Sequence, residues 1–179
     1  MKRTKNPAKE AEYRKRAADL VAQMTLHEKV SQMLSWAPAI ERLGIPAYNW
    51  WSEGIHGIGR AGTATVFPQA IGMAAAFDED MMEQVGNAVG VEARGKYNMC
   101  RAHGDRDIFK GLTVWAPNIN IFRDPRWGRG HETYGEDPFL TSRLGVRFVE
   151  GMQGDDPDYL QAAACAKHFA VHSGPESDR

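Results

Sequence analysis

Cysteine is scarce in this sequence of 179 residues, which contains only Cys100 and Cys165. Two cysteines are too few for a disulfide framework or for a zinc site built from cysteine ligands. We expect both to be buried thiols, because an unpaired cysteine packs as a small apolar side chain. Cysteine usage therefore leaves the compartment of the protein open.

Long apolar runs are absent as well. No stretch approaches the roughly 20 apolar residues that a helix needs to span a bilayer, so we expect no membrane partner. Residues 1–9 are basic and polar, and no apolar segment follows them, so no signal peptide is visible. The localisation is unknown on these grounds, with the cytoplasm as the default expectation.

Neither sign of charge is in excess. The sequence has 22 Lys and Arg against 23 Asp and Glu, which gives a formal net charge of -1. No global field therefore attracts nucleic acid or an anionic surface. We expect no nucleic-acid partner, and a neutral substrate fits this balance.

Motifs of nucleotide-binding proteins and serine hydrolases are missing too. The sequence has no Walker A motif, no G-x-G-x-x-G after a predicted strand and no G-x-S-x-G elbow. We therefore expect no cofactor and no nucleophilic serine or cysteine.

Two helices are predicted at the start of the chain. Apolar residues recur at helical spacing over residues 7–24. Thr25 and Glu28 then have the spacing of a capping box, which predicts the start of a second, short helix. Its apolar residues should face inward: Leu26, Val30, Met33 and Leu34.

Strands and helices alternate along the rest of the chain. After a loop-rich stretch at 44–72, we expect a helix over 80–102, a strand over 112–121, a helix beginning at Asp137-Pro138 and a strand over 161–170. This alternation predicts the α/β class with a parallel sheet.

Polar residues follow each strand-like run, at 53–56, 118–129 and 167–178. In a β/α barrel this is the C-terminal face, where active sites lie. A complete barrel takes roughly 250 residues, so we expect the N-terminal portion of a (β/α)8 TIM-like barrel, incomplete, and a chain that is a fragment. Residues 1–40 would be leading helices packing on the barrel, and residues 41–179 its first part.

The first polar cluster sets Trp50 and Trp51 beside Glu53. This combination suits a sugar, because an aromatic face stacks on the ring while a carboxylate accepts hydrogen bonds from hydroxyl groups. The alternative is a strand end with core tryptophans and a capping glutamate.

The second cluster is rich in arginine, with Arg123, Arg126 and Arg129 near Asp124 and Glu132. A guanidinium group can hold pairs of oxygen atoms, including vicinal diols. The alternative is a loop held together by internal Arg–Asp and Arg–Glu pairs, with one arginine still able to face a ligand.

The third cluster contains Lys167, His168 and His172. A regular strand would direct the successive Lys167 and His168 to opposite faces, so both can face one ligand only where the strand ends or twists. His168 and His172 have the spacing of a helical zinc pair, but the glutamate of that motif is missing and the preceding run predicts a strand. We expect no metal site.

Five segments together resemble glycoside hydrolase family 3, in its β-glucosidase and β-xylosidase branch, which includes some α-L-arabinofuranosidases. These segments occur in the same order as in the family: residues 48–57, 63–72, 121–129, 132–138 and 167–169. The resemblance implies a (β/α) barrel whose −1 subsite grips the hydroxyl groups of a sugar.

By position, the resemblance places Glu53 as a hydroxyl-binding carboxylate, often Asp in the family, and Arg129, Lys167 and His168 as ring-binding residues. It also points to Arg60 as a further contact. These residues would bind and orient the substrate, a β-linked oligosaccharide or glycoside, and would not be the nucleophile or the general acid.

The resemblance further implies a retaining mechanism with two carboxyl groups about 5–5.5 Å apart. The family nucleophile is an Asp on a later strand, and Ser177-Asp178 lies too close to Lys167 to be that motif. We therefore expect nucleophile and acid beyond Arg179, and an inactive isolated chain derived from an exo-acting β-glucosidase or β-xylosidase. The alternative is a non-catalytic carbohydrate-binding or scaffold fragment. In either case the exposed barrel edges would favour self-association.

Overall fold

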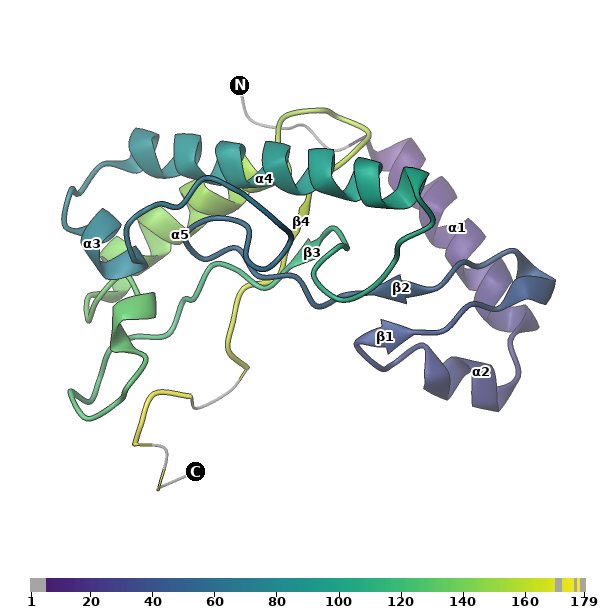
Figure 1. The fold of residues 1–179 in the computed structure, drawn as a ribbon, viewed down its shortest axis with the longest axis horizontal. Coiled ribbons are helices and arrows are strands. Elements are labelled where there is room, and N and C mark those ends of the chain that lie inside the picture. The colour runs from purple at the N-terminus through teal and green to yellow at the C-terminus, as the bar shows by residue number, and fades with distance from the viewer. Residues whose placement is uncertain (1–5, 170–171, 176, 178–179) are drawn as a thin grey trace.

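The computed structural model describes residues 6–169, 172–175 and 177. Figure 1 shows the order of its elements. They are α1 (Pro7–Gln23), α2 (Leu26–Ser31), β1 (Trp36–Ala37), η1 (Glu41–Leu43), β2 (Tyr48–Asn49), α3 (Ala70–Ala74), α4 (Glu79–Ala102), β3 (Thr113–Val114), η2 (Gly130–Glu132), α5 (Pro138–Gln153) and β4 (Ala163–Ala164).

Three parallel strand segments lie side by side. β3 pairs with β4 in the register Val114↔Ala164, and Val114 also forms a parallel bridge with Ser52 on its other side. α4 connects the first segment to the second, and α5 connects the second to the third. This is the α/β arrangement of the N-terminal part of a (β/α) barrel, and the predicted fold class is confirmed.

The observed strands are shorter than the predicted ones over 112–121 and 161–170. Pairing continues past β3 and β4, because the Lys167 amide donates to the Pro117 carbonyl (3.0 Å) and the Ile119 amide donates to the Lys167 carbonyl (2.9 Å). Pro117 itself has no N–H to donate, so the ladder becomes irregular there. Residue 170 lies outside the described residues.

Helix starts follow the predicted capping signals. Thr25 and Glu28 form the complete capping box of α2, and Asp137 caps α5 with Pro138 as its first residue. α4 begins at Glu79, capped by Asp78, slightly earlier than expected. The short helix α3 falls at the end of the stretch that we expected to be loop-rich.

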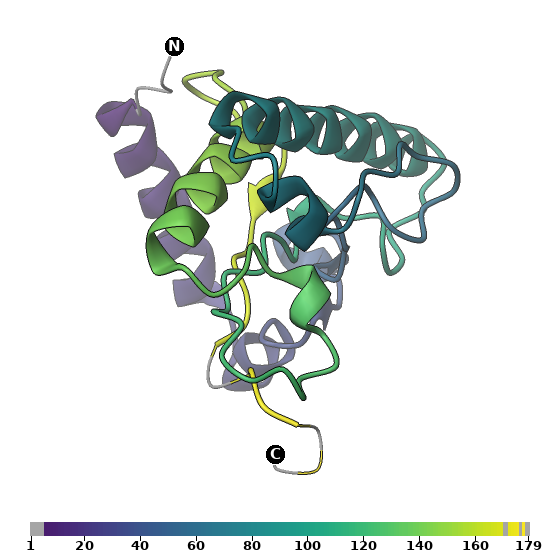
Figure 2. The ribbon, with the colours of Figure 1, turned by 90° about the vertical axis from the view of Figure 1, so that its left-hand side faces the viewer.

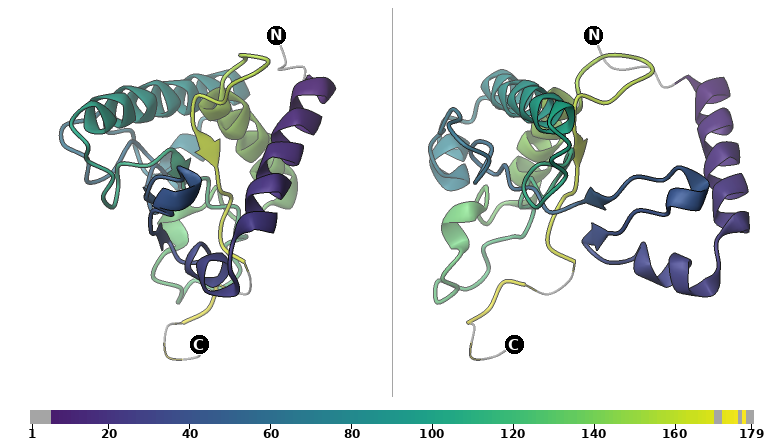
Figure 3. Two further views of the ribbon diagram at one scale, coloured as in Figure 1. Left: turned by 90° about the vertical axis from the view of Figure 1, so that its right-hand side faces the viewer. Right: turned by 45° about the vertical axis from the view of Figure 1, so that its right-hand side comes forward.

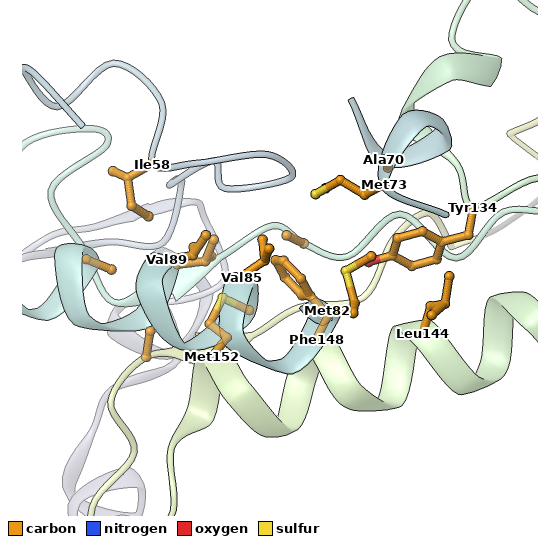
Figure 4. Packing of buried hydrophobic residues seen from close by; sticks show 14 of the residues in the cluster. Ile58, Ala70, Met73, Met82, Val85, Val89, Tyr134, Leu144, Phe148 and Met152 are labelled. Carbon is orange, nitrogen blue, oxygen red and sulfur yellow. The ribbon is translucent and has the colours of Figure 1, made fainter. Parts of the chain in front are cut away.

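The core lies where α5 crosses α4, on one face of the parallel strands (Figures 1 and 2). Its largest fully buried side chains from these two helices include Phe148, Met82 and Leu144. Figure 4 shows how these side chains lie among the rest of the core. Glycine permits the close approach: a Cβ added at Gly86 would lie 2.3 Å from the Phe148 carbonyl oxygen. The helices α4 and α5 therefore cover one face of the parallel strands.

That one-sided cover explains an error about the cysteines. Cys165 is exposed and Cys100 is partly exposed, so the prediction of two buried thiols is wrong. Ala162 and Ala164 pack in or against the core. Cys165 points the other way, because side chains alternate along a strand.

The leading helices stand apart from α4 and α5, beyond β1 and β2 (Figure 3). The expected inward face of α2 is wrong for this chain: Leu26 is 78% exposed and Met33 is 76% exposed, and Val30 and Leu34 are exposed as well. The amphipathic pattern is present, but no described element covers its apolar side chains.

No helix in the described part of the chain is long and apolar enough to cross a membrane.

Candidate functional site

The candidate site lies where the chain leaves the three parallel strand segments. Glu53 follows the strand residue Ser52, Arg129 lies in the segment after β3, and Lys167 follows β4. The backbone bridge between Asn118 and Lys167 holds the last two segments together. The carboxyl ends of parallel strands meet at one edge, so the fold itself brings these side chains close.

Glu132 is the carboxylate at the centre of the cluster. Arg129 donates to both of its oxygen atoms at 2.6 Å, and the Lys167 ammonium lies 4.0 Å away. Burial alone would raise the pKa of Glu132, but the Arg129 hydrogen bonds and the charges of Arg129 and Lys167 outweigh it and lower the pKa. Glu132 is therefore ionised at neutral pH.

The Lys167 side chain is largely buried, with 15% of its surface exposed. Burial lowers its pKa and the charge of Arg129 lowers it further, whereas Glu132 and Glu53 raise it. The charge of Glu53 also raises the pKa of Arg129. Glu53, Arg129 and Lys167 thus share one electrostatic neighbourhood.

Glu53 sits beside an aromatic pair. The Trp51 indole N–H donates to Glu53 Oε1 (3.2 Å), and the Trp51 ring stacks on Trp115 with centroids 4.7 Å apart. Trp51 is 37% exposed, so it is not the core tryptophan of the alternative interpretation. The site therefore offers a carboxylate next to an accessible aromatic face.

His168 belongs to a second part of the cluster, built around Asn120. Its backbone amide donates to Asn120 Oδ1 (2.9 Å), and its Nδ1 lies 2.9 Å from the same oxygen. The Asn120 amide group donates to the His172 carbonyl oxygen (3.0 Å), and Arg129 Nη1 lies 3.0 Å from His172 Nε2. The rings of His168 and His172 meet edge to face at 4.2 Å. This network connects His168 to Arg129.

The other arginines behave differently from one another. Arg126 forms a bidentate pair with Asp124, as the alternative interpretation of this loop expected, and that pair lowers the pKa of Asp124 to about 2. Arg123 instead reaches the Ile121 carbonyl (3.4 Å). The Arg60 guanidinium lies over the ring of Phe109, 5.4 Å from its centroid, and Phe109 is outside the cluster.

Glu132 and His172 lie in the predicted polar clusters, but neither was predicted to bind substrate, and Asn120 was not predicted at all. The Arg129–Glu132 pair matches the Arg–Glu pairing of the alternative interpretation of the arginine-rich loop. Asn120 gives no comparable signal in the sequence, since both of its partners are about 50 residues away. Within the described ranges, no three His, Cys, Asp or Glu side chains are grouped as ligands of a metal ion would be.

Comparison with known proteins gives a consistent result. The model of the family described as "Glycosyl hydrolase family 3 N terminal domain" matches residues 16–179. The chain is 51% identical over 169 residues to a xylan 1,4-beta-xylosidase of Xylanibacter ruminicola, covering 93% of this chain and 20% of that protein. It is 49% identical over 175 residues to the probable beta-D-xylosidase 7 of Arabidopsis thaliana, covering 88% and 22%.

Solved structures agree with these relatives. A GH3 exo-beta-xylosidase in complex with a xylobiose aziridine probe matches with a TM-score of 0.78 and 38% identity, over 89% of this chain and 21% of that one. A GH3 beta-glucosidase of Bifidobacterium adolescentis matches with a TM-score of 0.70 and 30% identity, over the same shares of 89% and 21%. The chain therefore spans about a fifth of the length of these proteins.

Proposed function

This chain belongs to glycoside hydrolase family 3, and we propose that it supplies the sugar-gripping half of a retaining, exo-acting β-glycosidase site. The names of the relatives favour a β-xylosidase, with a β-glucosidase as the alternative. In this proposal Glu53, Arg129, Lys167 and His168 form the −1 subsite, and the substrate is a β-linked glycoside or oligosaccharide.

One observation carries the proposal: the carboxyl ends of three parallel strand segments bring together the Glu53 carboxylate, the Arg129 and Lys167 cations, and His168. Sugar hydroxyl groups both donate and accept hydrogen bonds. Glu53 would accept from a hydroxyl group, Lys167 and Arg129 would donate, and the accessible face of Trp51 would stack on the ring.

The described cluster suits binding better than bond cleavage. Both oxygen atoms of Glu132 are held by Arg129, and its pKa is lowered, so it is neither a proton donor nor an available nucleophile at neutral pH. Retaining cleavage needs an attacking carboxylate and a protonated carboxyl group about 5–5.5 Å apart. We propose that the longer polypeptide supplies both, as the family resemblance implies.

The test compares the isolated chain with the complete enzyme on aryl β-xylosides and aryl β-glucosides. We expect no turnover by the 179-residue chain. In the complete enzyme, Lys167→Ala should lower kcat/KM roughly ten- to a hundredfold, because it removes a charged hydrogen-bond donor worth about 1.5–3 kcal/mol.

Arg126→Ala is the matched control, because Arg126 is held by Asp124 in the same loop and 71% of its side-chain surface is exposed. Its kcat/KM should stay near the wild-type value. The proposal would be contradicted if the isolated chain hydrolysed these substrates and Lys167→Ala abolished that activity. Such a result would mean that the chain both binds and cleaves the sugar. Sugar binding without turnover in the complete polypeptide would support the non-catalytic alternative.

A further inference from the structure

Asn120 bridges two segments that the site needs. Its backbone amide donates to Oδ1 of the buried Asn118 (3.0 Å), and the neighbouring Ile119 amide donates to the Lys167 carbonyl (2.9 Å). These two backbone hydrogen bonds fix the position of Asn120 independently of its side-chain contacts with His168 and His172. The bond between Ile119 and Lys167 also ties the Asn120 segment to the Lys167 segment.

The orientation of the Asn120 carboxamide is determined by its partners. The His168 backbone N–H can only donate and lies 2.9 Å from one end of the group, so that end is the oxygen. The His172 carbonyl can only accept and lies 3.0 Å from the other end, so that end is the NH₂ group. Two independent backbone groups therefore specify the same orientation of the amide.

This orientation fixes the proton on the His168 ring. Nδ1 of His168 lies 2.9 Å from Asn120 Oδ1, and an amide oxygen only accepts, so Nδ1 carries the hydrogen. In the neutral ring Nε2 is then a hydrogen-bond acceptor. His172 is specified in the same way: the Arg129 guanidinium only donates, so Nε2 of a neutral His172 accepts and its proton is on Nδ1.

We propose that Asn120 is a positioning residue that holds His168 in the Nδ1–H tautomer and keeps His172 in place against Arg129. For catalysis this rests on the proposed function: a neutral His168 would accept a hydrogen bond from a sugar hydroxyl group, while Lys167 and Arg129 donate. A single face of the sugar would then meet acceptors and donors in a fixed pattern.

Nitrogen-15 NMR of selectively labelled histidine side chains tests this proposal in the complete enzyme without sugar. Wild type should show a protonated Nδ1 and an unprotonated Nε2 at His168 at a pH where the ring is neutral. Asn120→Ala should lose this preference and give a mixture of both tautomers. Asn98→Ala, on an exposed position of α4, is the control and should keep the wild-type tautomer.

Asn120→Asp separates the acceptor role of Asn120 toward His168 from its donor role toward His172. It also keeps the proposal testable if the alanine variant does not fold. The carboxylate retains an acceptor for Nδ1, so the Nδ1–H tautomer should persist, and its charge should raise the pKa of His168. It cannot donate to the His172 carbonyl, so the signals of His172 should shift. An unchanged tautomer in Asn120→Ala, or an unchanged His168 pKa in Asn120→Asp, would overturn the proposal.

Titration with xylose keeps this inference distinguishable from the proposed function. If His168 is in the Nδ1–H tautomer but its nitrogen-15 signals do not change with xylose, the role of Asn120 is supported and the sugar site is contradicted. A response of His168 to xylose together with a protonated Nε2 in the sugar-free wild type would support the sugar site and refute the role of Asn120.

Discussion

Glu132 lies between Arg129 and Lys167 and influences the protonation of both. Burial lowers the pKa of the Lys167 ammonium, and Glu132 is the group that most opposes this effect. A lysine with a lowered pKa loses its proton at a lower pH than usual, so sugar binding that needs the ammonium group should fall as the pH rises through that lowered value. We therefore predict that the pair sets the alkaline limit of sugar binding.

Glu132→Gln should move this alkaline limit to lower pH, because it removes the negative charge that keeps Lys167 protonated. The measurement is the pH dependence of kcat/KM in the complete enzyme, or of xylose affinity. Glu150→Gln is a control of the same chemistry on α5, where the partner is Arg147. An alkaline limb at the same pH in Glu132→Gln and wild type would contradict this role.

At this scale the sequence predicted part of the site. Glu53, Arg129, Lys167 and His168 are in recognisable motifs, and the structure brings their segments together; their roles toward a sugar stay a prediction. Asn120 was beyond reach, because its importance depends on two contacts across about 50 residues. The spacing of Lys167 and His168 likewise did not show where each side chain would point.

Among the elements, the crossing of α4 and α5 depends on glycine. A Cβ at Gly86 would lie 2.3 Å from a backbone oxygen of α5, whereas a Cβ at Gly95 of the same helix would meet nothing within 4 Å. Gly86→Ala should therefore destabilise the fold by about 1–3 kcal/mol through overpacking. Gly95→Ala should stabilise it by about 0.5–1 kcal/mol, because alanine restricts the unfolded chain.

Urea unfolding of both variants measures the difference. Equal effects of the two substitutions would show that the helices can separate at little cost, contrary to the close packing described above.

The sequence predicted the helices themselves well, because capping residues such as Thr25 and Asp137 act locally. It predicted strands that were too long, because strand pairing depends on partners elsewhere in the chain and on the interruption at Pro117.

At the scale of the whole molecule, exposed apolar residues and strand edges determine how the chain should behave in solution. The exposed apolar residues near α2 include Leu26, Val30, Met33 and Trp36, and the core formed with α4 and α5 covers one face of the parallel strands. Exposed apolar patches and open strand edges favour association. We predict that the isolated chain forms oligomers or aggregates at micromolar concentration, as measured by sedimentation velocity.

Met33→Glu should reduce this association, because it places a charge in the exposed apolar patch. Val91→Glu is the control, since Val91 is exposed on α4, away from α2. A monomeric wild-type chain with one sharp unfolding transition would refute the prediction. The domain boundary near residue 40 stays a prediction at this scale.

The helices α4 and α5 contain none of the residues that we propose for the sugar site. Protein engineers can use this separation between the helix-covered face of the sheet and its carboxyl edge. Substitutions that raise heat tolerance, such as Gly95→Ala, should combine additively with substitutions that change sugar selectivity, because distant sites without shared partners act independently. A thermostable parent could thus be prepared first, and its preference for particular sugars could be evolved afterwards.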